Sequence, residues 1–252
     1  SPEEKIKMKK KIFNLGKILQ NILFSYGFIF DLIRPSNQLE KSLLLLLTSR
    51  GITSLIDIGA NKGQFAKRIR ILGYKGDLLC IEPIVALQKD LEKIENKYPK
   101  TKIMTGIAVS DKSGIQEFNI SKNSVSSSLN NINSRHIISA PGSENVATQK
   151  VEVMTLLDLI EGFADKEALA IKIDVQGHEN ILINDIKKSE LGAIKIILVE
   201  LSRVQLYENS QTDKELVPVL EEMGFELYSL NCGFSDTETG EMLQYDAIYV
   251  RD

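Results

Sequence analysis

Chemically active side chains are concentrated in the segment Lys172-Ile-Asp-Val-Gln-Gly-His-Glu179. The apolar residues before it predict a buried strand, so the side chains of Lys172, Asp174, His178 and Glu179 would gather at the carboxyl end of that strand. Open α/β sheets bind their ligands at this end. Because a histidine titrates near neutrality, His178 is a candidate general base, with Asp174 as the second candidate. The segment therefore predicts a site for acid–base chemistry.

These residues also have structural interpretations. A histidine at the start of a helix can be structural, Glu179 in the first helical turn would favour the helix dipole, and Lys172 would pair with a neighbouring acid. Glu200 ends the next apolar run and would project from the neighbouring strand. Asp174, His178 and Glu200 could together bind Mg²⁺, although carboxylates on adjacent strand ends can equally bind ligand hydroxyls. Both alternatives stay open.

A second site is indicated by Asp57-Ile-Gly-Ala-Asn-Lys-Gly63, a glycine-bearing turn between a predicted strand and a predicted helix. Gly59 and Gly63 let the backbone approach a ligand closely, and Asn61 tolerates a positive φ. The turn lacks the G-x-G-x-x-G pattern of dinucleotide-binding proteins. The carboxylate of Asp57 would repel a pyrophosphate and attract an amine. The turn therefore favours a cationic nucleoside over a dinucleotide.

Glu82 supports this interpretation. It ends the next apolar run, directly before Pro83, about 20 residues after the glycine turn, where an acid accepts hydrogen bonds from ribose hydroxyls. Ribose together with an amino-acid-like cation indicates S-adenosylmethionine. Each motif alone is also typical of an ordinary tight connection, so the prediction depends on their order and spacing.

Composition excludes some classes of protein. The chain has 252 residues, of which 43% are hydrophobic and 26% charged, enough for one main domain. A formal net charge of -3 argues against a nucleic-acid partner bound through a broad basic face. The two cysteines, Cys80 and Cys232, have neither metal-binding spacing nor a disulfide pattern, which fits a reducing cytoplasm.

The first 50 residues form a separate arm in this prediction, and residues 51–252 form the main domain. The arm carries many lysines around apolar residues at near-helical spacing, from Lys5 to Phe30. Such a basic amphipathic helix can lie on the inner face of an anionic membrane, or it can pack on its own domain or on a second subunit. The sequence shows no signal peptide and no run long enough to span a membrane.

Apolar runs alternate with helical patterns through the main domain, which predicts a parallel sheet with helices on both faces. Two final strands joined without a helix would pair antiparallel. The polar segment 115–149 is too polar for a core element and is expected to be an active-site flap or a passive insertion. The predicted strands are Leu55–Ile58, Leu78–Ile81, Thr101–Val109, Lys150–Met154, Leu169–Ile173, Lys195–Leu201, Phe225–Leu230 and Tyr245–Val250. The predicted helices are Gln64–Leu72, Ile84–Lys97, Thr155–Glu161, Glu179–Lys187 and Lys214–Met223.

At these motifs the chain resembles the FkbM family of S-adenosylmethionine-dependent O-methyltransferases. The resemblance rests on 57–63, Ile81-Glu-Pro83, Ile107-Ala-Val-Ser-Asp111, the neighbourhood of 126–129, Val153-Met-Thr-Leu-Leu-Asp158 and 172–179. It implies the class I methyltransferase fold, a seven-stranded, mostly parallel sheet with an antiparallel C-terminal strand. Similar proteins often carry Glu where this chain has Gln176, which weakens any role for a carboxylate there.

The resemblance also implies which residues bind the cofactor. Asp57, Gly59, Asn61 and Gly63 would contact its methionine part, Glu82 and Pro83 its ribose, and Ile107 and Ala108 its adenine. Ser127 and Asp174 would complete the cofactor site.

The expected activity is O-methylation of a hydroxyl, on a sugar of a surface polysaccharide, a glycolipid or a sugar nucleotide. Serine and asparagine side chains in the polar segment suit a hydroxylated acceptor, and His136 within it is a candidate substrate contact. Two alternatives remain. A nicotinamide-dependent oxidoreductase would use the same turn and Glu82, and a non-catalytic adenosyl-ligand sensor would keep only the first site.

Overall fold

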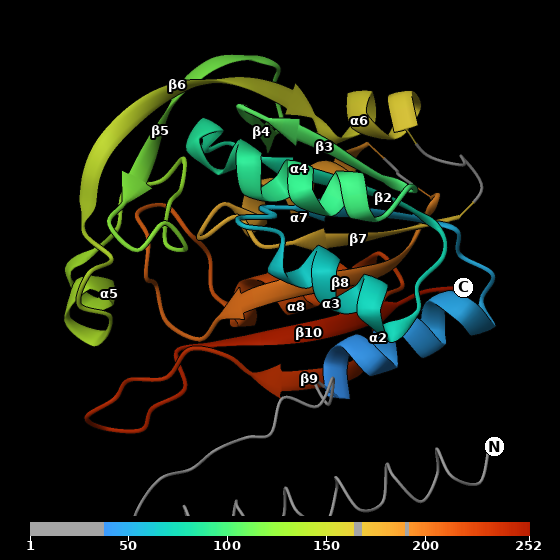
Figure 1. The fold of residues 1–252 in the computed structure, drawn as a ribbon. Helices are drawn as coiled ribbons and strands as arrows, with labels where there is room; N and C mark the ends of the chain where they lie inside the picture. The colour runs from blue at the N-terminus through green and yellow to red at the C-terminus, as the bar shows by residue number, and fades with distance from the viewer. Residues whose placement is uncertain (1–37, 164–167, 190–191) are drawn as a thin grey trace, which may run out of the picture. The chain divides into compact units, whose positions relative to one another are not determined.

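A seven-stranded sheet in the order β3-β2-β1-β7-β8-β10-β9 organises the fold of the computed structural model (Figure 1). Strand β10 pairs antiparallel with both of its neighbours, and all other neighbours in the sheet pair in parallel. This is the class I methyltransferase arrangement, so the expected fold is confirmed. Its strands are β1 (Ser54–Ile58), β2 (Asp77–Glu82), β3 (Thr101–Thr105), β7 (Leu169–Ile173), β8 (Ile194–Ser202), β9 (Glu226–Cys232) and β10 (Gln244–Val250).

The structure describes residues 38–163, 168–189 and 192–252. The basic amphipathic arm predicted between Lys5 and Phe30 lies outside them, so its role stays a prediction. Helix α2 (Gln38–Ser49) belongs to the same compact unit as the sheet, which runs from Gln38 to Asp252. Within the part of the chain described, no helix has the length and apolar character needed to cross a membrane.

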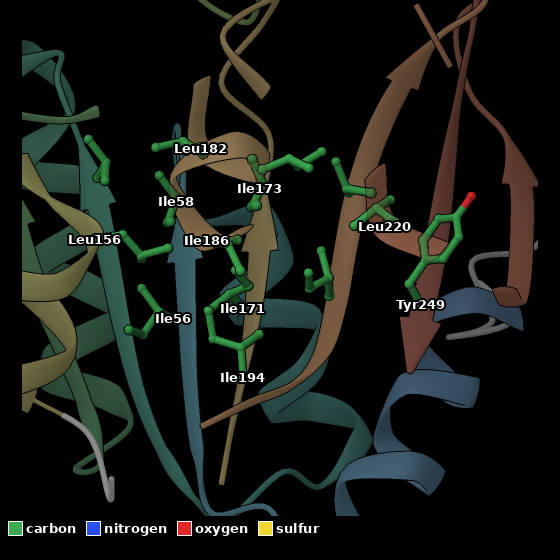
Figure 2. Packing of buried hydrophobic residues seen from close by; sticks show 14 of the residues in the cluster. Ile56, Ile58, Leu156, Ile171, Ile173, Leu182, Ile186, Ile194, Leu220 and Tyr249 are labelled. Carbon is green, nitrogen blue, oxygen red and sulfur yellow. The ribbon is translucent and has the colours of Figure 1, made fainter. Parts of the chain in front are cut away.

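Helices cover both faces of the sheet because side chains alternate along its buried strands. Leu55 faces one layer, with α2, α3 (Gln64–Leu72) and α4 (Gln88–Lys97). Ile56 and Ile58 face the other layer. There they pack with α6 (Leu156–Phe163), α7 (Glu179–Lys188) and α8 (Asp213–Glu222). In Figure 2, Ile171 and Ile173 of β7 lie beside Ile56 and Ile58 of β1 in this second layer.

The segment predicted as one strand from Thr101 to Val109 is two strands in two different sheets. Gly106 separates them with a φ of 75°, which a residue with a side chain adopts only under strain. Strand β4 (Ile107–Ser110) joins a second sheet, in the order β4-β6-β5, with β5 (Gly114–Ser121) and β6 (Asn145–Thr155). The prediction missed this break because strand-forming residues such as Ile103 and Val109 stand on both sides of Gly106.

The polar segment 115–149 begins and ends in strands, so the prediction that it holds no core element was wrong. Strands β5 and β6 form a long antiparallel ladder that arches over the main sheet (Figure 1). Many of their side chains face water, which is why the sequence looks too polar for a sheet, while Phe118 and Val151 are buried. The short helix α5 (Ser134–Ser139) lies in the connection between the two strands.

Most remaining elements agree with the sequence prediction within a few residues. The predicted helix from Ile84 to Lys97 is a 3-10 turn, η1 (Val85–Leu87), followed by α4. The predicted C-terminal antiparallel pair is present, with β10 inserted between β8 and β9. Cys80 is buried and Cys232 is exposed, and neither forms a disulfide.

Candidate active site

A cavity of about 430 Å³ lies at the carboxyl ends of β1, β2, β7 and β8. Residues of β4 and of the connection between β5 and β6 complete its wall. The structure thus brings the two predicted sites into one cavity, as the carboxyl edge of a parallel sheet requires. The cavity is lined by these residues from the sequence prediction: Gly59, Asn61, Glu82, Pro83, Ile107, Ala108, Ser127, Lys172, Asp174, His178 and Glu200.

Gly59 is required by a close approach between β1 and β7. Its φ is 83°, and a Cβ at this position would stand 1.8 Å from the carbonyl oxygen of Asp174. Asn61 follows with a φ of 48°. Gly63, with a φ of 76°, caps the start of α3. Because Gly59 has no side chain, the backbone of this turn can lie directly against the ends of β1 and β7.

Glu82 holds this turn in place. Its two carboxylate oxygens accept hydrogen bonds from the backbone N–H groups of Asn61, at 2.7 Å, and Ile84, at 2.9 Å. Burial raises the pKa of Glu82 to about 7. Each oxygen keeps a further lone pair that can accept a ribose hydroxyl. Glu82 can thus order the turn and bind a ligand at the same time.

Asp57 has a different neighbourhood from the one the sequence suggested. Its side chain is fully buried and is not among the residues that line the cavity. Nζ of Lys172 lies 3.2 Å from Asp57 Oδ1 and 2.9 Å from Asp174 Oδ2. Burial alone would lower the pKa of Lys172, but the charges of Asp174 and Asp57 raise it above its ordinary value. Lys172 therefore joins a buried acid to one that lines the cavity.

Glu179 supports the turn after β7. Its carboxylate accepts hydrogen bonds from the backbone N–H groups of Val175, at 3.1 Å, and Gly177, at 2.9 Å. Burial raises its pKa to about 7. Glu179 and Gly63, like Asp57, are absent from the cavity lining. These three residues act on the cavity through the backbone or through another side chain.

His178 lines the cavity with its ring nearly buried. Nε2 lies 2.9 Å from the hydroxyl oxygen of Ser110, which also lies 3.2 Å from Asp111 Oδ1. Nδ1 has no hydrogen-bond partner among the described residues. Burial lowers the pKa of His178 to about 4, against the charge of Asp111. At neutral pH the ring is therefore uncharged.

Gln176 connects the acids of the cavity. Its Nε2 donates to Asp174 Oδ1 at 2.9 Å and to Glu200 Oε2 at 2.8 Å, and its Oε1 accepts from the hydroxyl of Tyr207 at 2.7 Å. Burial and the charge of Asp174 raise the pKa of Glu200 well above its ordinary range. An amide suits this position better than a carboxylate, because it donates to both acids.

The metal set suggested by Asp174, His178 and Glu200 is not supported. Among the described residues, no group of three or more histidine, cysteine, aspartate or glutamate side chains is arranged to hold a metal ion. Asp174 and Glu200 share the amide of Gln176, whereas His178 pairs with Ser110 on another element. The two acids are joined by a hydrogen-bond donor where a cation would have to lie.

Several residues of the cavity carried no sequence signal. Phe118, Phe234 and Gln244 line it, although they lie in a strand, a turn and a strand far from the two motifs. Ser110, which does not line the cavity, belongs to the matched Ile107-Ala-Val-Ser-Asp111 run, but its pairing with His178 depends on tertiary contact. His136, a candidate substrate contact, also lines the cavity.

The lining fits the S-adenosylmethionine that the resemblance implies. The carboxylates of Glu82 and Asp174 favour a positively charged ligand with ribose hydroxyls. Ile107, Ala108 and Phe118 offer an apolar surface for a base. The missing Cβ of Gly59 leaves the backbone accessible next to Asp174.

Comparison with known proteins gives the following matches. A family model described as the methyltransferase FkbM domain matches residues 57–227. Fibrillarin from Aeropyrum pernix, in a structure with natively bound S-adenosyl-L-methionine, is 10% identical with a TM-score of 0.43, over 79% of this chain and 66% of that chain. Precorrin-6y C5,15-methyltransferase from Geobacter metallireducens is 11% identical with a TM-score of 0.41, over 89% of this chain and 94% of that one.

A TehB-like S-adenosylmethionine-dependent methyltransferase from Corynebacterium glutamicum is 11% identical with a TM-score of 0.39, and the match covers 100% of both chains. No curated protein matches this sequence.

Proposed function

Because this chain belongs to the methyltransferase FkbM domain family and is an S-adenosylmethionine-dependent methyltransferase, we propose a sugar as its methyl acceptor. The methyl group would be transferred to a hydroxyl oxygen of that sugar. The acceptor would be a surface polysaccharide, a glycolipid or a sugar nucleotide. The observation that carries this proposal is the uncharged, buried His178, whose Nδ1 lacks a partner among the described residues in a cavity that also fits the cofactor. An alcohol needs such a base, because its own proton leaves during methyl transfer.

Bound S-adenosylmethionine supplies a methyl group made electrophilic by the sulfonium. The chain then has to hold the acceptor oxygen in line and accept its proton. In this proposal Nδ1 of His178 takes the proton, and Ser110 fixes the ring through Nε2. Lys172 and Gln176 hold the carboxylate of Asp174 in position, where it would face the positive charge of the cofactor.

The other residues keep the roles that the resemblance implies, except that Asp57 and Gly63 lose their direct contact with the cofactor. Gly59, Asn61, Glu82, Pro83, Ile107, Ala108 and Ser127 would contact the cofactor directly, because they line the cavity. Asp57, Gly63 and Glu179 act indirectly, because they are absent from the cavity lining. Asp57 sets the position of Lys172.

A hydroxyl-rich acceptor is supported by the polar part of the lining. Asn123, Ser124, Ser126, Gln176 and Gln244 all line the cavity with uncharged polar groups. Gln176 can only accept from a ligand, because Asp174 and Glu200 already use its two N–H donors. Recognition of several hydroxyls requires such groups. They come from the segment 121–144 and from the ends of β7 and β10. The same features favour a sugar over a nucleic-acid partner in this proposal.

We also propose a role for the basic amphipathic arm predicted between Lys5 and Phe30. The basic arm before Gln38 would bring the enzyme to the inner face of a membrane carrying a lipid-linked acceptor, or would mediate self-association. The reaction would then take place in the cytoplasm.

The proposal is tested by incubating the full chain with S-adenosylmethionine carrying a radiolabelled methyl group and with a cell-wall and lipid glycan extract. We expect label in a sugar methyl ether. His178→Ala should lower turnover by about 100-fold or more, and Asp174→Asn should weaken cofactor binding. Label on nitrogen or carbon, or full turnover by both variants, would contradict the proposal.

Ligand binding and labelling together test the two alternatives, a nicotinamide-dependent oxidoreductase and a non-catalytic adenosyl-ligand sensor. Calorimetry should detect S-adenosylhomocysteine and no nicotinamide cofactor, because the family is one of methyltransferases and the turn lacks the dinucleotide pattern. A chain that binds S-adenosylhomocysteine but labels no acceptor in a broad glycan panel would be a ligand sensor.

A further inference from the structure

Both histidines of this chain, His136 and His178, line the same cavity. They come from elements far apart in sequence, α5 and the turn before α7. Each ring is at least nine-tenths buried. In each, Nε2 lies beside a serine hydroxyl and Nδ1 has no partner within the described part of the chain. Only His178 has a role in the function proposed above, so the second buried nitrogen needs an explanation.

The ring of His136 is fixed from three sides. It meets the ring of Tyr207 edge-on, with centroids 5.0 Å apart, and lies at 30° to the ring of Phe234, with centroids 5.5 Å apart. Its Nε2 lies 3.3 Å from the hydroxyl oxygen of Ser126. Tyr207 is fully buried, and its hydroxyl donates to Gln176 at 2.7 Å. Through Tyr207, His136 is therefore connected to Gln176, which bridges the carboxylates of Asp174 and Glu200.

The hydrogen-bond network assigns opposite tautomers to the two rings. The Ser126 oxygen accepts from the amide of Asn123 at 3.0 Å, and Nε2 of His136 is the one acceptor within reach of the Ser126 hydroxyl among the described residues, so this hydroxyl donates to Nε2. That leaves a proton on Nδ1 of His136. At the other ring, the Ser110 hydroxyl donates to Asp111, so Nε2–H of His178 donates to Ser110 and Nδ1 of His178 carries the lone pair.

An unpaired buried N–H is unfavourable, because it has lost water without gaining another acceptor. Burial also lowers the pKa of His136 to about 4, so the ring remains neutral and keeps one donor. Among the described residues, the side-chain contacts of its ring are two aromatic rings and a serine, and Nδ1 has no acceptor. A ligand oxygen in the cavity that His136 lines can supply the missing acceptor.

We propose that Nδ1–H of His136 donates a hydrogen bond to a non-reacting oxygen of the acceptor, while Nδ1 of His178 receives the proton of the reacting hydroxyl. This inference rests on the function proposed above and narrows its substrate class. The acceptor must present a second oxygen near the methylated one, as the vicinal hydroxyls of a sugar do, and a simple monohydric alcohol lacks it. Both nitrogens are nearly closed to solvent, so in this proposal acceptor binding has to open the cavity wall beside each ring.

The first experiment reads the tautomers directly. With only two histidines in the chain, nitrogen-15 labelling of histidine in the full protein gives two sets of ring signals, assigned with His136→Gln and His178→Gln. In the complex with S-adenosylhomocysteine we expect Nδ1–H for His136 and Nε2–H for His178. An Nε2–H tautomer at His136 overturns the proposal, and this reading requires no acceptor.

The second experiment measures acceptor use in the radiolabelled glycan extract. His136→Phe keeps an aromatic ring without a donor and should raise the apparent KM for the acceptor about tenfold, with little change in kcat. His136→Asn places an amide nitrogen near the position of Nδ1 and should recover most of this loss. Arg135→Gln, on the exposed side of α5, is the matched control and should leave the KM unchanged.

S-adenosylhomocysteine affinity separates a failure of the proposed function from a failure of the role proposed for His136. All three variants should bind it like the wild type. If wild-type protein binds it but labels no sugar, the proposed function fails, and the tautomer reading still decides the state of His136. If wild-type protein labels a sugar and His136→Phe does so with an unchanged KM, or loses S-adenosylhomocysteine affinity to the same extent, only the role of His136 is overturned.

Discussion

The carbonyl oxygen of Asp174 lies so close to Gly59 that a Cβ at Gly59 would stand 1.8 Å from it. This contact joins the ends of β1 and β7, which carry the two motifs read from the sequence. It lets the glycine turn and the acid of the second motif face one cavity. The integrity of the site therefore depends on one absent side chain.

Gly59→Ala should separate the two strand ends or distort the turn, because both the contact and the φ of 83° exclude a side chain. We expect S-adenosylhomocysteine affinity to fall at least about tenfold and the free energy of unfolding to fall by about 2 kcal/mol. Calorimetry and urea unfolding measure these changes. Gly162→Ala in α6, where a Cβ meets no atom within 4 Å, should bind normally.

Glu82→Gln should weaken nucleoside binding by about tenfold. One carboxylate oxygen becomes an NH₂ group that faces the backbone N–H of Asn61 or Ile84, so the turn loses an acceptor that orders it. Isothermal titration with S-adenosylhomocysteine gives the dissociation constant. The exposed Glu226→Gln provides the comparison, and equal affinities for the two variants would remove Glu82 from the site.

Lys172→Met should lower the free energy of unfolding by about 3 kcal/mol, because it leaves the fully buried carboxylate of Asp57 without its cation. Adding Asp57→Asn should restore part of the loss, since the uncompensated charge is then removed. Urea unfolding followed by circular dichroism reports both. Lys93→Met, at the exposed pair with Asp90, should show no measurable change.

Acid should destabilise the wild type through His178. Its pKa falls from an ordinary value of 6.5 in the unfolded chain to about 4 in the folded protein, so the unfolded chain binds the extra proton first. The stability from neutral His178 is complete above pH 6.5 and is lost as the pH falls towards 4. The stability difference between wild type and His178→Gln should change by about 3 kcal/mol over this window. Parallel unfolding curves from pH 8 to pH 4 would contradict it.

Gln176→Glu should bring a third carboxylate next to those of Asp174 and Glu200, because the wild-type amide donates a hydrogen bond to each of them. We expect a loss of about 3 kcal/mol at pH 8. Lower pH should reverse part of this loss, because the raised pKa of Glu200 lets the folded protein take up a proton there before the unfolded chain does. Thermal melts at pH 8 and pH 6 test this, with the exposed Gln116→Glu as the control.

The sequence by itself determined the main sheet and both motifs. Buried apolar runs, helical spacing of apolar residues, and glycine or asparagine at a strand end are local signals, so Leu55–Ile58, Gln64–Leu72 and Leu169–Ile173 were predicted almost to the residue. Local signals failed at Gly106, where a single residue with positive φ separates two strands. They also failed in β5 and β6, where many side chains are exposed to solvent.

Only the tertiary structure decided which side chains meet. Asp57 and Lys172 are paired in the register of β1 and β7, so a carboxylate expected to bind the cofactor is fully buried and does not line the cavity. His136 reaches the cavity because Tyr207 and Phe234, far along the chain, pack against its ring. Spacing in the sequence fixes periodicity along one element, whereas hydrogen-bond partners and burial depend on the register and packing between elements that are distant in the chain.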